Sequence, residues 1–268
     1  MINDRIALST QDGIASVVLN RPAKMNALDD KMFAALIEAG QQIAADDSTR
    51  VVVISAKGKA FCAGLDMQNF ADLAGPNKQL GSLPNKLSKR THGIANDVQY
   101  AVWIWHELEI PVIAAVHGVA VGGGFQLALA ADMRYVAPDT RFSIMEMKWG
   151  LVPDMSSTQL MRHLASEDII RELTYTARLF DAQEAKEAGF VTKIVDDPLV
   201  HAMQVAKQIA MRNPKAVRAS KRILNAANYV TEAEGLLMES KEQDEILGSP
   251  NQIEAVMAEL QKRPAKFD

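Results

Sequence analysis

Two acidic residues stand close together in an otherwise apolar stretch of the chain. Glu146 lies between two methionines, and Asp154 follows a proline eight residues later. A carboxyl group among apolar neighbours either forms a salt bridge or has a raised pKa that suits it to proton transfer. Considered alone, each carboxyl is more often half of a salt bridge. The acid–base interpretation therefore depends on the residues that accompany the pair.

Two glycine-containing turns can place backbone N–H groups beside a reacting atom. Residues 122–124 are three glycines before a predicted helix over Phe125–Ala131, and a second turn spans Ala63–Asp66 after a predicted strand. Glycines let a ligand approach the backbone closely, and a helix N-terminus adds partial positive charge, which suits a phosphate or a developing oxyanion. A tight structural turn explains the three glycines equally well. Together, the two turns can each offer one N–H to a single oxygen.

Absent motifs and composition exclude several other kinds of chemistry. The glycine spacing is not that of a dinucleotide or P-loop motif, and the chain has no GxSxG or HExxH sequence. The single cysteine, Cys62, excludes an internal disulfide and a cysteine-based zinc site, and we expect no metal. With 29 basic and 33 acidic residues, the formal charge of −4 argues against general nucleic-acid binding. The basic turn at residues 21–24 is, by itself, most simply a solvated loop.

The elements that must position these residues follow from the apolar pattern. Five short apolar runs are predicted to be strands buried on both faces: Ile14–Leu19, Val51–Ser55, Pro111–Val116, Met133–Val136 and Val191–Val195. A helix is predicted over Asp29–Ala45, and only helical patterns follow Val195. We therefore divide the chain into an α/β core, residues 1–197, and a helical region, residues 198–268.

One segment has the length of a membrane span. Residues 110–131 contain no Asp, Glu, Lys or Arg, but a proline and four glycines divide the segment. We interpret it as a buried strand, a turn and a helix, and expect no membrane association. The N-terminus lacks the apolar core of a signal peptide, and a single cysteine fits a reducing compartment, which together predict a cytoplasmic protein.

In combination, these segments resemble the crotonase, or enoyl-CoA hydratase/isomerase, superfamily. The resemblance runs in order through NRPAKMNAL, KGKAFCAGLDM, PVIAAVHGVAVGGGFQLALAAD, FSIMEMKWGLVPD and AKEAGFVTKIV. It implies an α/β fold with a crotonase-like spiral of ββα turns, followed by C-terminal helices that assemble a homotrimer or hexamer. It also implies acyl-CoA thioester substrates, with coenzyme A as part of the substrate and no separate cofactor.

The resemblance also implies roles for individual residues. The backbone N–H groups of Leu65 and Gly123 would form the oxyanion hole for the thioester carbonyl, and Lys24 would contact a CoA phosphate. Two fixed donors stabilise the negative charge that enolisation places on that oxygen. Further substrate contacts are expected at Ala63, Asp66 and Gln126, and Phe267 resembles an aromatic residue of the CoA site.

The catalytic residues implied by the resemblance are Glu146 and Asp154. Hydratases of the family use two glutamates, but the first of these positions is Gln126 here, whose amide cannot take a proton near neutral pH. Dienoyl-CoA isomerases of the family pair a glutamate with an aspartate eight residues later. The aspartate removes a proton from C2 of the acyl chain, and the glutamate delivers one to C6. We therefore expect double-bond isomerisation, although those isomerases carry an acidic residue at the position of Gln126.

Other functions stay open at this point. A hydratase can work with Glu146 alone, dehalogenase-like relatives use an aspartate at position 154 as a nucleophile, and some members approach a non-catalytic CoA- or RNA-binding scaffold. A serine peptidase of similar fold would need a serine at the Gly123–Gln126 turn, which has none. The segment Asn69–Asn96 is expected to select the acyl chain. The side chains expected to line its pocket are Met145, Met147 and Trp149.

Overall fold

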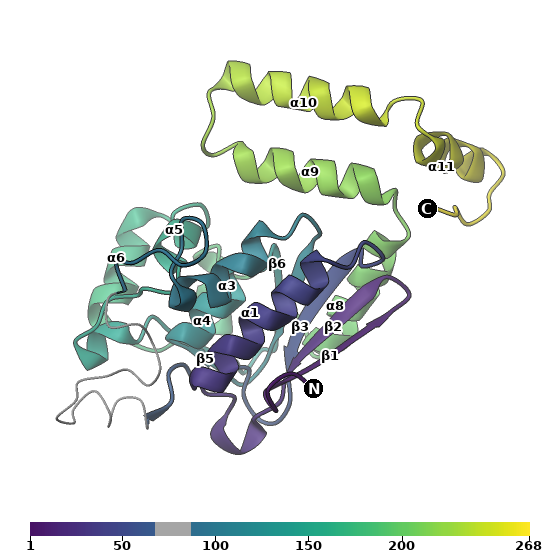
Figure 1. Cartoon of the computed structure of the whole chain (residues 1–268). Helices are drawn as coiled ribbons and strands as arrows, with labels where there is room; N and C mark the ends of the chain where they lie inside the picture. Colours follow the sequence, from purple (N-terminus) through teal and green to yellow (C-terminus); the bar gives the residue numbers. More distant parts are fainter. Residues whose placement is uncertain (68–86) are drawn as a thin grey trace.

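The computed structural model describes residues 1–67 and 87–268, which form two β-sheets, surrounding helices and a projecting helical region (Figure 1). The six-stranded sheet has the spatial order β1 (Ile6–Gln11), β2 (Ile14–Leu19), β3 (Val51–Ala56), β4 (Val112–Val116), β6 (Met133–Val136) and β9 (Lys193–Ile194). Its strands are parallel except in the β1–β2 hairpin. Most of the segment expected to select the acyl chain lies outside the described residues.

The central strands are buried on both faces, as the apolar runs predict. On β3, Val51 and Val53 pack in the same cluster as α8 (Pro198–Ala210), whereas Val52 and Ile54 join the larger core on the other face. Successive side chains of a strand point to opposite faces, so a strand covered on both sides needs apolar residues at every position. The fifth predicted strand is shorter than expected because it pairs only with the end of β6.

The helix predicted after residue 29 forms as α1 (Asp30–Ala44). The Asp29 carboxylate accepts a hydrogen bond of 2.9 Å from the Met32 N–H and so caps the helix. Its buried face, which includes Leu36, packs in the larger core together with α3 (Asp97–Glu107). Figure 1 shows α1 and α3 side by side on the same side of the sheet.

Strand β1 is missing from the sequence prediction. It pairs antiparallel with β2 through Asp12 and Gly13, whose φ angles are 53° and 74°. Two successive residues with positive φ form the turn type that matches the twist of a hairpin. Because β1 is an edge strand, its C-terminal half is polar and exposed. It therefore lacks the apolar run that marks its neighbours.

A three-stranded sheet carries the triple-glycine turn. β5 (Val119–Val121) pairs parallel with β7 (Arg141–Ser143), and β7 pairs antiparallel with β8 (Phe180–Asp181). α4 (Gly123–Leu129) follows β5 directly. The apolar segment 110–131 is therefore two strands and a short helix, and no described helix combines the length and apolar character that crossing a bilayer requires.

The remaining described elements are one short helix near the N-terminus and seven helices after residue 145. They are η1 (Pro22–Lys24), η2 (Glu146–Trp149), α5 (Ser157–Met161), α6 (Glu167–Thr176), α7 (Ala182–Glu187), α9 (Pro214–Ala226), α10 (Glu232–Ile246) and α11 (Pro250–Leu260), of which only η1 precedes residue 100. The helices predicted after Val195 are confirmed. α8 packs its alanines against the sheet, whereas α9, α10 and α11 stand apart from it (Figure 1). Lys221 ties α9 to the core through a 2.9 Å bond to the Asp132 carboxylate.

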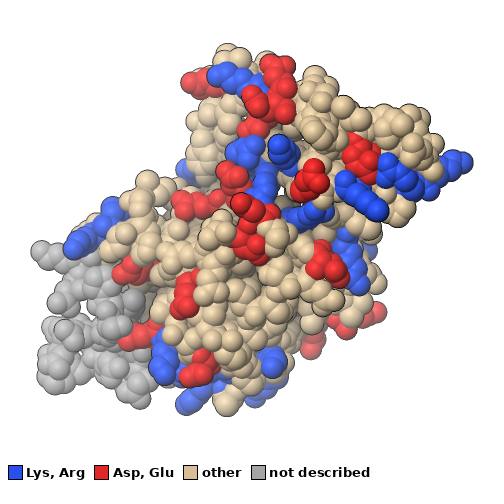
Figure 2. Space-filling model, turned by 45° about the vertical axis from the view of Figure 1, so that its right-hand side comes forward, with Lys and Arg blue, Asp and Glu red and all other residues tan. Residues whose placement is uncertain are grey.

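Charged side chains of both signs are mixed over the face that Figure 2 shows. Figure 2 shows Lys and Arg interspersed with Asp and Glu over the described part of the face in view. The backbone of a nucleic acid is recognised by a continuous basic surface, and this face presents none. The distribution agrees with the small formal charge of −4.

The turn between β4 and β5 contains a strict glycine requirement, which a substitution can test. Gly118 has a φ of 66°, and a β-carbon there would lie 2.0 Å from the Lys59 carbonyl oxygen, whereas Gly93, with a φ of 54°, has nothing within 4 Å. Both Gly118→Ala and Gly93→Ala carry the strain of a left-handed conformation, about 1–2 kcal/mol. Only Gly118→Ala also forces two segments apart. We expect it to lower the Tm clearly more than Gly93→Ala in thermal unfolding followed by circular dichroism; equal Tm values would mean that the close approach to Lys59 imposes no constraint.

Candidate active site

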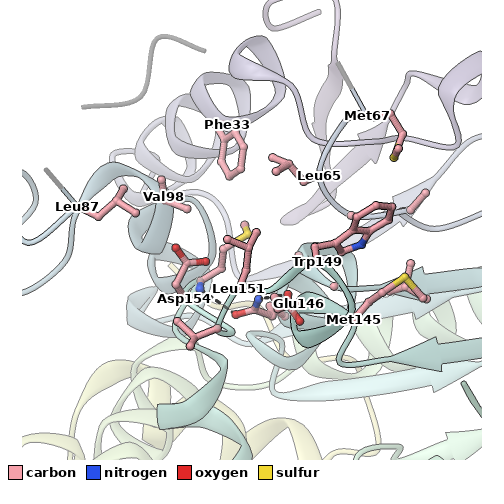
Figure 3. A pocket seen from close by; sticks show the side chains of 18 residues that line it. Phe33, Leu65, Met67, Leu87, Val98, Met145, Glu146, Trp149, Leu151 and Asp154 are labelled. Atoms are coloured by element: carbon pink, nitrogen blue, oxygen red, sulfur yellow. Dashed lines mark hydrogen bonds between the residues drawn. The ribbon is translucent and has the colours of Figure 1, made fainter. Parts of the chain in front are cut away.

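A cavity of about 350 Å³ brings most of the predicted site residues together. Six of them line it: Ala63, Leu65, Gly123, Gln126, Glu146 and Asp154. The rest of the wall is largely apolar. Figure 3 shows Phe33 and Leu65 on one side of the cavity and Glu146 and Asp154 on the opposite side. Of the three side chains expected in the acyl pocket, Met145 and Trp149 line the cavity and Met147 does not.

Backbone pairing brings the two glycine turns side by side. The Cys62 N–H donates to the Val119 carbonyl at 3.0 Å, and the Val121 N–H donates back to the Cys62 carbonyl at 3.1 Å. A β-carbon on Gly124 would lie 2.2 Å from that same Cys62 oxygen, so α4 can start here only with glycine. A β-carbon on Gly64 would lie 3.6 Å from the Gly123 nitrogen, which places the second turn against the first.

The two predicted oxyanion donors have free N–H groups. The Leu28 N–H donates to the Gly64 carbonyl at 2.7 Å and the Leu28 carbonyl accepts from Asp66 at 3.0 Å, so Leu65 turns its own N–H to the other side. Gly123 begins α4, where an N–H has no acceptor within the helix. Within residues 1–67 and 87–268, neither N–H has a hydrogen-bond partner, and both residues line the cavity. Such a pair can stabilise negative charge on one oxygen.

Strand pairing also fixes the position of Glu146. β5 and β7 are parallel, so their carboxyl ends meet at one edge of the small sheet, where the Gly122 N–H donates to the Ser143 carbonyl at 2.9 Å. η2 starts three residues after β7. As a result, the Glu146 carboxyl group lies next to the turn, with its Oε1 3.4 Å from the β-carbon position of Gly122.

Gln126 links the loops that carry the two carboxyl groups. Its Nε2 donates to Glu146 Oε1 at 2.6 Å, and its Oε1 accepts from the N–H of Met155 at 2.8 Å. The side chain is 1% exposed. The sequence suggests a substrate contact for Gln126, but both ends of its amide are bonded inside the protein.

Burial raises the pKa of both carboxyl groups. The pKa of Glu146 is raised chiefly by loss of water around the charge, with a smaller contribution from the nearby Asp154, and the hydrogen bond from Gln126 opposes this. The pKa of Asp154 is raised by the same loss of hydration. Neither group forms a salt bridge in the described part of the chain. Glu146 Oε2 is buried and has no hydrogen-bond partner among the described residues. The acid–base interpretation is therefore favoured over structural pairing.

Three predicted residues lie outside the cavity wall. Lys24 is exposed in η1. The buried Asp66 carboxylate pairs with Arg21, so its side chain is engaged with the protein. The Phe267 carbonyl accepts a hydrogen bond of 2.9 Å from Arg50, just before the start of β3, whereas the Ala63–Asp66 turn follows the other end of that strand.

Residues that sequence motifs do not reveal complete the wall. Phe33 on α1 and Val98 on α3 line the cavity, although each resembles an ordinary core position of an amphipathic helix. The Met155 N–H, which binds Gln126, also cannot be predicted, because a backbone donor has no signature in the sequence. Metal chemistry has no support in the described residues, where no cluster of His, Cys, Asp and Glu can hold an ion.

The raised carboxyl pKa values predict that the site destabilises the folded protein at neutral pH. A carboxyl with a raised folded-state pKa contributes full stability below its ordinary pKa, 4.5 for Glu146, and loses it as pH rises through the folded-state pKa. Glu146→Gln removes this loss. We expect its Tm to exceed that of the wild type at about pH 8, with the advantage shrinking toward acidic pH. Glu38→Gln, on the exposed face of α1, is the control for thermal unfolding across pH. An advantage independent of pH would contradict the assignment.

Comparison with known proteins supplies the family. The family model described as Enoyl-CoA hydratase/isomerase matches residues 9–268. The mitochondrial Delta(3,5)-Delta(2,4)-dienoyl-CoA isomerase of Mus musculus is 32% identical over 96% of this chain and 80% of its own length. The corresponding peroxisomal isomerase of Arabidopsis thaliana is 29% identical over 98% of this chain and 95% of its own length.

The fold has the same relatives. The crystal structure of an enoyl-CoA hydratase from Bacillus anthracis superposes with a TM-score of 0.86 at 28% identity, over 98% of both chains. An enoyl-CoA hydratase from Mycobacterium tuberculosis H37Rv gives a TM-score of 0.84 at 27% identity, over 99% of both chains. The crotonase-like α/β fold expected from the sequence is confirmed. The chain belongs to the enoyl-CoA hydratase/isomerase family.

Proposed function

We propose that this protein moves a double bond in an enoyl-CoA or dienoyl-CoA thioester by proton transfer. The observation that carries the proposal is that two carboxyl groups with raised pKa values line the same cavity as two backbone N–H groups that have no hydrogen-bond partner in the described part of the chain. Proton transfer needs one group that takes a proton and another that gives one, and the enolate between the two steps needs a stabilised oxygen.

The roles of the carboxyl groups follow from the reaction. Ionised Asp154 removes a proton from C2, and the electron pair of that C–H bond moves toward the thioester oxygen, which Leu65 and Gly123 N–H groups stabilise. Neutral Glu146 then delivers a proton at the far end of the conjugated chain, C6 in a dienoyl substrate. One proton leaves and one arrives, so the product has the mass of the substrate. The deep burial of Glu146 supports its role as the neutral acid.

Three exposed lysines on two neighbouring turns are the basic groups proposed for the CoA phosphates. Asn26 Nδ2 donates to the carbonyls of Lys57 and Ala60, both at 2.9 Å, which fixes the turn after β3 beside the turn that carries Lys24. Lys24, Lys57 and Lys59 are exposed. The substrate thus supplies the coenzyme A, and the mechanism uses no separate cofactor. Because similar isomerases are named mitochondrial or peroxisomal, the cytoplasmic location stays a prediction.

Hydration is the second candidate function, and the hydratase structures with the same fold favour it. A hydratase would use Glu146 to activate water. Gln126 opposes this function, since its amide cannot take or give a proton near neutral pH. Mass spectrometry separates the two reactions directly, because hydration adds one water to the product and isomerisation adds nothing.

Substitution of the two carboxyl groups tests the mechanism. Wild-type protein is incubated with 2-enoyl-, 3-enoyl- and 3,5-dienoyl-CoA, and the products are followed by absorbance and mass. We expect isomerisation, with Asp154→Asn and Glu146→Gln each lowering kcat by ~10²–10⁴, the usual contribution of a positioned acid or base. KM should change little, because the N–H groups and Lys24 are untouched. Asp139→Asn, an exposed aspartate, is the control.

The outcome that would overturn the proposal is full turnover by both variants on the best substrate. A severe loss in Glu146→Gln with a mild loss in Asp154→Asn, together with a product one water heavier, would instead establish the hydratase. If the wild type binds acyl-CoA but turns over none of the three substrates, the non-catalytic scaffold is favoured.

We also propose that the projecting helices mediate a homotrimer or hexamer. Large apolar side chains are exposed there, including Leu224 at 70%, Leu236 at 64%, Leu237 at 54% and Leu260 at 74%. Apolar surface of this extent is normally covered by another subunit. Light scattering at micromolar concentration should give three or six times the chain mass, and the double substitution of Leu236 and Leu237 by Glu should reduce it. A stable monomeric wild type would refute this proposal.

A further inference from the structure

The orientation of the buried Gln126 amide is fixed by its surroundings. A backbone N–H can only donate, so the Gln126 atom 2.8 Å from the Met155 nitrogen must be the carbonyl oxygen. The amide NH₂ must then face Glu146 Oε1, 2.6 Å away. The side chain is 1% exposed, so rotating it would leave two buried polar groups without partners. The Glu146 oxygen that faces Gln126 is therefore always an acceptor.

This fixed donor determines where a neutral Glu146 carries its proton. Oε1 receives a hydrogen from Gln126 and cannot also carry one pointing along the same line. A carbonyl oxygen is a stronger acceptor than a hydroxyl oxygen, so this contact favours the proton on Oε2, which is buried and has no partner among the described residues. We propose that Gln126 is a positioning residue that keeps the proton of neutral Glu146 on Oε2, the oxygen that Gln126 does not contact. The proposal rests on the proposed isomerase function.

A second consequence concerns the geometry of the two acids. Asp154 immediately precedes Met155, whose N–H holds the Gln126 carbonyl, and the other end of the amide holds Glu146. One rigid planar group therefore spaces the base from the acid. An apolar side chain of similar size fills the same volume but controls neither the proton nor the spacing.

Two substitutions separate these effects. Gln126→Met keeps the length of the side chain and removes donor and acceptor at every pH. Gln126→Glu keeps both only while the introduced carboxyl is protonated, because the neutral acid accepts from Met155 with one oxygen and donates to Glu146 with the other. Ionisation turns that donor into a like charge beside Glu146. Gln183→Met is the matched control, since Gln183 donates to Glu187 Oε1 at 2.8 Å on the exposed α7.

The readouts are kcat, KM and the pH profile of isomerisation. We expect Gln126→Met to lower kcat about 10-fold or more while KM stays within about threefold, since binding groups are untouched. Losing a hydrogen bond that lowers the pKa of Glu146 moves the alkaline limb of kcat, where the acid ionises, to higher pH. Gln126→Glu should be active at acidic pH and should lose kcat as the introduced carboxyl ionises. The pH profile of the wild type lacks this limb. Gln183→Met should leave kcat and its profile unchanged.

An infrared titration makes this proposal separable from the isomerase function. The C=O stretch of protonated Glu146, identified as the band lost in Glu146→Gln, reports its titration without turnover. In Gln126→Met we expect the band to persist to higher pH than in the wild type. If the wild type isomerises but Gln126→Met keeps both kcat and the titration, the positioning role is wrong and the function stands. If the titration moves but the wild type does not isomerise, the isomerase function is wrong. If Gln126→Met fails to fold, the pH profile of Gln126→Glu alone tests the positioning role. Activity at acidic pH that is lost at alkaline pH is the expected result.

Discussion

The site depends on the close pairing of two backbone segments, the turn after β3 and the strand β5. Hydrogen bonds through Cys62 bring their carbonyls so near that a β-carbon at Gly118 or Gly124 would lie within 2.2 Å of one of them. This approach sets the Leu65 and Gly123 N–H groups beside the same cavity. The parallel pairing of β5 with β7 then brings Glu146 to the same turn. A small displacement of these paired segments would move both N–H donors away from the carboxyl groups.

The interior of the site combines groups that folding alone would not place there. Two carboxyl groups lose much of their hydration, and one oxygen of Glu146 has no partner within the described chain. Other buried charged groups have partners: Lys221 pairs with Asp132, Asp66 pairs with Arg21, and Arg134 donates to backbone carbonyls. The contrast identifies the cavity as the place where stability has been given up for chemistry. Gln126 limits the cost by holding Glu146 and the Asp154 loop with one side chain.

The apolar pattern predicted the central strands and the C-terminal helices because each has a local signature, and the family resemblance supplied six of the residues that line the cavity. Strands buried on both faces are continuously apolar, and glycine marks a close backbone approach at Gly124. The edge strand β1 and the three-residue strands β5 and β7 are too polar or too short for such a signature. Long-range relations were also hidden: the Met155 N–H that binds Gln126, and the Arg21 that engages Asp66. The internal hydrogen bonds of Gln126 add a structural role to the predicted substrate contact, which stays a prediction.

The burial of the only cysteine has a practical consequence. Cys62 is completely buried, its thiol donates to the Asn26 carbonyl, and burial raises its pKa to about 12. The thiolate is the reactive form, so alkylating reagents and peroxide have almost no target while the fold is intact. Because Cys62 lies in the backbone pairing that sets the two glycine turns, modification requires these segments to separate. The rate at which the native protein is alkylated therefore measures how often the paired segments around Cys62 separate.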